Sequence, residues 1–147
     1  MTLADISEAT PRYEDDFVLW AQRQAELLRA RQFSTLDIAN LSEEVMSMVG
    51  HERRALKHRL EVLITHLLKC ELQPGSHTRS WDSTILEQRE RIADILADSP
   101  SLRADMSSVL PQAYQHAAKM AAAQTGVAID GFPKVCPFSL AEILEQP

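Results

Sequence analysis

The sequence contains few of the residues that build turn-rich or disulfide-stapled folds. Of its 147 residues only four are glycine and two are cysteine, and aromatic residues make up 5%. The shortage of glycine disfavours a β fold with many tight turns. Cys70 and Cys136 fit neither a disulfide framework nor a zinc-ligand spacing. We therefore expect a helical protein with an aliphatic core and two free thiols in a reducing cytosol.

Long apolar runs are also absent from the sequence. No stretch approaches the roughly 18 apolar residues that a membrane-spanning helix requires. Residues 1–10 lack a basic stretch followed by an apolar one, so we expect no secretory signal there and a frayed N-terminus. The formal net charge of −6 disfavours nucleic acid as the main partner. These absences favour a cytoplasmic protein with no membrane partner.

Apolar residues recur every three or four positions in four segments, which is typical of helices with one buried face. The longest segment, residues 36–72, predicts a central helix of roughly 54 Å. A first helix is expected from Pro11 to near Arg31, a third over about 78–97 and a fourth over 100–125. The sequence thus predicts an all-α, up-and-down bundle of four main helices in a single domain, residues 1–147.

Residues with special backbone preferences mark where these helices begin and end. Asp37, with or without a neighbouring hydroxyl side chain, is expected to cap the central helix, and residues 73–76 (Gln-Pro-Gly-Ser) break the chain after it. Pro111 is expected to bend or split the fourth helix, and Gly126 to cap its C-terminus. Residues 127–147 predict an extended strap followed by a short C-terminal helix.

A polar seam runs along the apolar stripe of the central helix. Glu52, Arg59 and His66 follow one another at steps of seven residues, which places them beside the leucines of one face. They are either structural groups that pair at the edge of a core, or a binding or catalytic seam. Since an unpaired buried carboxylate would cost several kcal/mol, we predict that Glu52 binds Arg59 or an arginine of a neighbouring helix.

The turn after the central helix gathers a second set of polar and aromatic residues. If the flanking helices return antiparallel, His66 faces Thr84 and Glu61 faces Arg89. We predict that Trp81 anchors this hairpin in the core. The cluster is either a structural lock or a site. Its members are Lys69, Gln73, Arg79, Trp81, Thr84 and Arg89.

Histidines on the central helix raise the question of a metal site. His58 and Glu61 are three residues apart, but their order is the reverse of the Glu-x-x-His pairs of di-metal bundles. No other predicted helix offers a matching pair, and His77 and His116 are isolated in the sequence. We therefore expect no metal and no cofactor.

Basic residues on the central helix raise the alternative of a nucleic-acid surface. Without a helix-turn-helix spacing, they are more simply a solvated face. The residues are Arg53, Arg54, Lys57 and Arg59, with Arg79, Arg89 and Arg91 beyond the turn.

Short motifs along the chain occur together in one order. They are Tyr13-Glu14-Asp15-Asp16-Phe17, Asn40-Leu41-Ser42-Glu43-Glu44, Glu52-Arg53-Arg54-Ala55-Leu56, His66-Leu67-Leu68-Lys69, Gln73-Pro74, Arg79-Ser80-Trp81, Thr84-Ile85, Ser99-Pro100-Ser101-Leu102, Thr125-Gly126 and Cys136-Pro137-Phe138. From about Tyr13 to Leu144 this set resembles the bacterial and cyanobacterial family catalogued as domain of unknown function twenty-nine. The resemblance implies an all-helical single domain and no particular activity.

The sequence favours a small cytoplasmic bacterial protein with an interaction or accessory role, bound to a partner protein or to a second copy of itself. No catalytic sequence motif is present, which disfavours an enzyme. A ligand-binding or enzymatic bundle that uses the polar seam or the turn-side cluster is the alternative. A nucleic-acid-associated protein is a second alternative.

Overall fold

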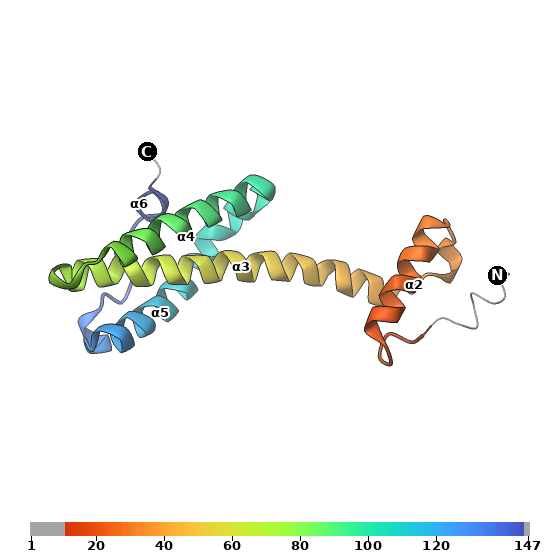
Figure 1. Ribbon diagram of the computed structural model, residues 1–147, viewed down its shortest axis with the longest axis horizontal. Coiled ribbons are helices and arrows are strands. Elements are labelled where there is room, and N and C mark those ends of the chain that lie inside the picture. Colours follow the sequence, from red (N-terminus) through yellow and green to blue (C-terminus); the bar gives the residue numbers. More distant parts are fainter. Residues whose placement is uncertain (1–10, 146–147) are drawn as a thin grey trace. The chain divides into compact units, whose positions relative to one another are not determined.

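The computed structural model describes residues 11–145, which contain five α helices and no strand (Figure 1). The helices are α2 (Phe17–Arg29), α3 (Ile38–Leu72), α4 (Arg79–Asp98), α5 (Met106–Thr125) and α6 (Leu140–Leu144). Short 3-10 helices connect them: η1 (Phe33–Thr35), η2 (Pro74–Ser76), η3 (Pro100–Asp105) and η4 (Ile129–Gly131). The predicted all-α architecture of four main helices and one short one is confirmed. The frayed segment expected over residues 1–10 lies outside the described residues.

The described residues form two compact units, residues 11–50 and residues 51–145, which we call the N-terminal and C-terminal units. The long helix α3 contributes residues to both. The single domain expected over residues 1–147 stays a prediction.

In the N-terminal unit, polar side chains of α2 hold the start of α3. Asp16 caps α2 by accepting a hydrogen bond from the backbone of Leu19. Buried Trp20 donates its indole N–H to the Asp37 carboxylate at 3.0 Å, and buried Gln24 accepts from the Asp37 backbone at 2.8 Å. Asp37 also accepts from the backbone of Asn40, so its predicted role as the cap of α3 is confirmed.

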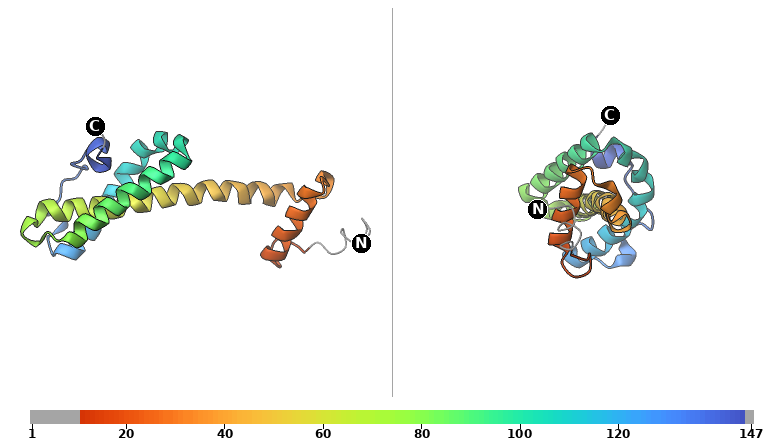
Figure 2. Two further views of the ribbon diagram at one scale, coloured as in Figure 1. Left: turned by 45° about the horizontal axis from the view of Figure 1, so that its top comes forward. Right: turned by 90° about the vertical axis from the view of Figure 1, so that its right-hand side faces the viewer.

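In the C-terminal unit, α4 and α5 lie along α3, and α6 closes the core (Figure 2). The buried face of α3 begins at Leu56 and continues through Leu68 with the three-to-four-residue period of an amphipathic helix. Small side chains of α5 allow close helix contact. The fully buried members of this core include Leu56, Leu60, Leu63, Ile64, Ile92, Ala113, Ala117, Ala121 and Ile143.

The fourth predicted helix differs from the expectation at its beginning. Residues 100–105 form η3, and α5 then runs through Pro111 without a break. Of the two outcomes predicted at Pro111, a bend or a split, the split is therefore wrong. Pro111 lies in the second turn of α5, where it removes one backbone bond, to the carbonyl of residue 107. Ser107 is exposed, so water can bind that carbonyl.

The predicted C-terminal cap of α5 and the predicted N-terminal capping box of α6 are both confirmed. Gly126 ends α5 in a left-handed conformation with φ of 77°, which glycine adopts without a Cβ clash. Ser139 and Glu142 form the capping box of α6.

Candidate functional site

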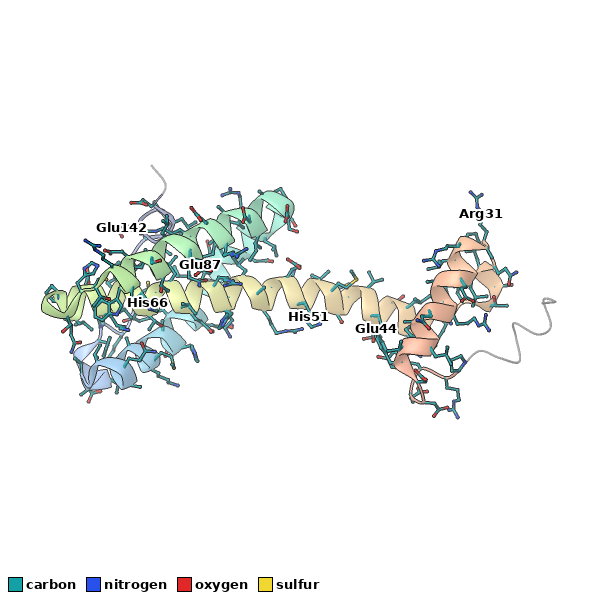
Figure 3. All side chains as sticks on the ribbon, viewed as in Figure 1. Arg31, Glu44, His51, His66, Glu87 and Glu142 are labelled. Atoms are coloured by element: carbon teal, nitrogen blue, oxygen red, sulfur yellow. The ribbon has the colours of Figure 1, made fainter. Side chains whose placement is uncertain are left out.

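No hydrogen bond or ion pair joins Glu52, Arg59 and His66, the three residues of the predicted polar seam on α3. Glu52 is exposed and makes no hydrogen bond or ion pair to any residue between 11 and 145, so the prediction that it binds a basic side chain is wrong. It lies one turn before Leu56, the first buried residue of α3, and water therefore solvates its carboxylate. Arg59 instead donates to Gln88 of α4 at 3.4 Å. His66, labelled on α3 in Figure 3, bonds through Nδ1 to the carbonyl of Val62 in the same helix at 2.9 Å.

Three members of the turn-side cluster do come together, at the end of α3. The Lys69 ammonium lies 4.6 Å from the centroid of the Trp81 ring and donates to Gln124 of α5 at 3.0 Å. Gln73 donates to the carbonyl of Thr125 at 3.1 Å. These contacts join the C-terminal ends of α3 and α5 to the first turn of α4, as a structural lock would.

Trp81 is half-buried, so its predicted place in the core is wrong. It is the third residue of α4, where Thr78 caps the helix. Its ring stacks on the His77 imidazole with centroids 6.0 Å apart, while Lys69 covers it. The tryptophan ring therefore packs between Lys69 and His77 at the edge of the hairpin and does not enter the core.

The other three cluster members make other contacts, and no hydrogen bond or ion pair joins His66 to Thr84 or Glu61 to Arg89. Thr84 bonds within its own helix, and Arg79 is exposed. Arg89 binds the last turn of α6, with Nε at 2.9 Å from the Ile143 carbonyl and Nη2 at 3.2 Å from the Glu142 carbonyl. Arg89 does not pair with Glu61 because its guanidinium is directed at the backbone of α6.

Basic side chains from α3 and α5 lie near one half-buried carboxylate of the C-terminal unit, that of Glu61. Glu61 has only 14% of its side chain exposed. His58 Nδ1 lies 3.9 Å from its Oε2, His116 Nε2 lies 3.8 Å from the same oxygen, and Lys57 Nζ lies 3.9 Å from Oε1. All three separations exceed hydrogen-bond length, and the Lys57 contact is an ion pair whichever protonation state the two histidines have. Glu61, His58 and His116 border a cavity of about 130 Å³ that His66 also lines.

His116 and His77 are isolated in the sequence, but the fold brings each of them close to a carboxylate. The sequence could have indicated a contact for His116. It directly precedes Ala117, which is buried, so its imidazole lies at the edge of the face through which α5 packs. His77 Nε2 lies 2.5 Å from an Asp82 oxygen and 3.8 Å from the Cys70 sulfur. Burial raises the pKa of the Cys70 thiol, the Asp82 charge adds to this and Lys69 opposes it, so the environment favours the protonated thiol.

The basic residues proposed for nucleic acid do not form one free face. Arg53 donates to Asp105 at 3.0 Å, and half-buried Arg59 is directed at Gln88. Arg54 is exposed. Because the phosphate backbone is bound by clustered free cations, this distribution gives the nucleic-acid alternative little support.

We predict that the purified protein contains no stoichiometric metal. Within residues 11–145, no three histidine, cysteine, aspartate or glutamate side chains are arranged so that they could hold an ion. Elemental analysis of the dialysed protein is expected to find far less than one equivalent of zinc, iron or manganese. About one equivalent that disappears in His116→Ala would contradict this and would place a metal beside Glu61.

Comparison with known proteins identifies the family of the chain. Residues 12–147 match the family described as domain of unknown function DUF29. The chain belongs to this family. The match confirms the resemblance found in the sequence, and the helical structure agrees with the fold expected of a DUF29 member. No curated protein and no solved structure shows a significant match. None of the described helices of this DUF29 chain has both the length and the apolar character needed to cross a membrane.

Proposed function

We propose that this DUF29 chain is a small cytoplasmic bacterial protein that acts as an interaction module, with its contact surface on the N-terminal unit. One observation carries the proposal. Of the fifteen large apolar side chains that are exposed in the described residues, ten lie between residues 17 and 49. These ten are Phe17, Val18, Leu19, Leu28, Phe33, Ile38, Val45, Met46, Met48 and Val49.

These side chains support a contact surface because they lie close together in the sequence, whereas exposure alone would not indicate a partner. Single exposed apolar residues are normal on protein surfaces, whereas a dense group usually marks a site where another molecule binds. On α3, Val45 is 58% exposed, Met48 is 65% exposed and Val49 is 37% exposed, and they follow one another at helical spacing. Methionine side chains adapt easily to the shape of a partner. This surface suits the apolar face of another protein.

Two further observations support the proposed compartment and role. Cys70 and Cys136 are free thiols, which agrees with a reducing cytosol. The polar residues that the sequence offered as a catalytic seam do not bond to one another: Glu52 is exposed, and Arg59 donates to Gln88. Interaction is therefore a better-supported role than catalysis at that seam.

The test is a double substitution, Val45→Lys with Met48→Lys, compared with Leu86→Lys as a single-charge control in the other unit. Leu86 is 58% exposed on α4 of the C-terminal unit, so its replacement adds a charge at an equally exposed apolar position. Affinity purification from the native host with mass spectrometry is expected to recover a partner with the parent and the control. The double variant is expected to lose that partner while circular dichroism shows unchanged helix content.

Sedimentation distinguishes a foreign partner from a second copy. A parent that sediments above its monomer mass of 16.5 kDa, together with a monomeric double variant, would identify the partner as the chain itself. Identical partners and identical mass for the parent and both variants would contradict the proposed surface.

A further inference from the structure

Two adjoining cavities lie between α5 and the strap of residues 129–138, all within the C-terminal unit. The first has a volume of about 600 Å³ and the second about 300 Å³. Tyr114, Gln115 and Lys134 line both, so the two cavities form parts of one depression, which we call the strap groove. Volumes of a few hundred Å³ are typical of small-molecule sites.

Contacts within the chain fix the residues at the base of the strap groove. Tyr114 is 3% exposed, and its hydroxyl donates to the carbonyl of Pro133, which ties the strap to α5. Burial raises the pKa of Tyr114, so the hydroxyl keeps the proton that it donates. Phe132 is buried beside this bond and anchors the strap in the core. The groove is therefore formed before any ligand arrives.

Apolar side chains line both cavities and are left uncovered. Ile129, in the first cavity, is 49% exposed. Val135, in the second, is 78% exposed, the highest value among the exposed large apolar residues of the described chain. Covering these side chains would remove apolar surface from water, at about 25 cal/mol for each Å². An occupant therefore needs an apolar body that extends along the strap.

Two lysines give the strap groove a charge opposite to that of the chain. The sequence has four lysines and a formal net charge of −6. Lys57 and Lys69 have partners, Glu61 and Gln124 respectively. Lys119 on α5 and Lys134 on the strap line the first cavity from its two sides, and neither forms an ion pair with the described residues.

The charges in the groove favour an anionic occupant. Asp130 is the one acidic residue that lines the two cavities, so the cationic side chains outnumber it. A lysine ammonium is a compact point charge with three donors, which suits a carboxylate at the mouth of an apolar groove.

We propose that the strap groove binds an amphiphilic carboxylate, a small organic anion with an unbranched apolar body such as a medium-chain fatty acid. Lys119 and Lys134 hold the carboxylate. The apolar body lies over Tyr114 and reaches toward Val135. This site is independent of the interaction surface proposed on the N-terminal unit, and either can fail without the other.

Isothermal titration calorimetry of the full chain with sodium decanoate, kept below its micelle-forming concentration, tests the proposal. Decanoate is expected to bind with a stoichiometry of one, and Lys119→Gln with Lys134→Gln is expected to weaken it at least tenfold. The control is Arg91→Gln with Arg103→Gln, which removes the same charge from two exposed arginines outside the groove and should leave the affinity unchanged. Acetate, which lacks the apolar body, and decyltrimethylammonium, which has the opposite charge, are expected not to bind measurably.

Three results would overturn the proposal. One is the absence of decanoate binding to a parent protein whose circular dichroism shows it folded. The second is equal loss of affinity in the lysine and arginine double variants, which would show a general charge effect. The third is sedimentation of the protein with phosphatidylglycerol vesicles without any binding of monomeric decanoate, which would assign the groove to a lipid surface.

Discussion

Leu60→Ala is expected to lower the free energy of unfolding by about 2–5 kcal/mol. Val45→Ala, on the same helix, is expected to change it by less than about 0.5 kcal/mol. Leu60 is fully buried in the core of the C-terminal unit, and its removal leaves a cavity lined by close-packed side chains. Val45 is 58% exposed and leaves no cavity. Alanine has a higher helix propensity than leucine or valine, so a change in helix propensity cannot cause the expected loss of unfolding free energy at Leu60.

Urea denaturation followed by far-ultraviolet circular dichroism measures both changes. Each variant is compared with the parent at the same protein concentration, because association through the apolar surface would add to apparent stability. A loss at Val45 as large as that at Leu60 would show that the first half of α3 is buried. The proposed interaction surface would then have to be abandoned.

Val45 and Leu60 show which features of α3 sequence periodicity can predict and which it cannot. The bounds of α3 could be predicted closely, because Asp37 caps it and the break at residues 73–76 ends it. The stripe that carries Val45 and Leu60 is continuous in the sequence. Periodicity defines the face of a helix but not whether a neighbour covers that face. The error at Glu52 has this cause, since it lies on the stripe where α3 is exposed.

The candidate site shows the same limit. Lys69, Gln73 and Trp81 could be grouped from the sequence because a short turn keeps them together. Arg89 and His116 could not be placed, because their partners depend on how α6 packs on α4 and how α5 packs on α3. Such contacts join residues more than 50 positions apart, and no local spacing encodes them.

The two tryptophans of the chain are expected to differ strongly in their contribution to stability. Trp20→Ala should cost about 3–5 kcal/mol, the range for a large aromatic removed from a core. Trp20 is 2% exposed, and its ring meets that of Tyr13 edge-on at 4.9 Å. The change also removes the indole donor of Asp37, the cap of α3. Trp81→Ala should cost only about 1 kcal/mol, because Trp81 is half-buried and held by a cation–π contact with Lys69.

Hydrogen exchange with mass spectrometry separates these effects by unit, since it reports protection in each helix. Trp20→Ala is expected to remove protection from α2 and from the first turns of α3. Trp20→Phe serves as the control: it keeps an aromatic ring but lacks the indole N–H, and should lose only about 1 kcal/mol. If Trp81→Ala instead cost as much as Trp20→Ala and deprotected α4, Trp81 would be the core anchor that the sequence predicted. Its half-exposed place beneath Lys69 would then not describe the folded chain in solution.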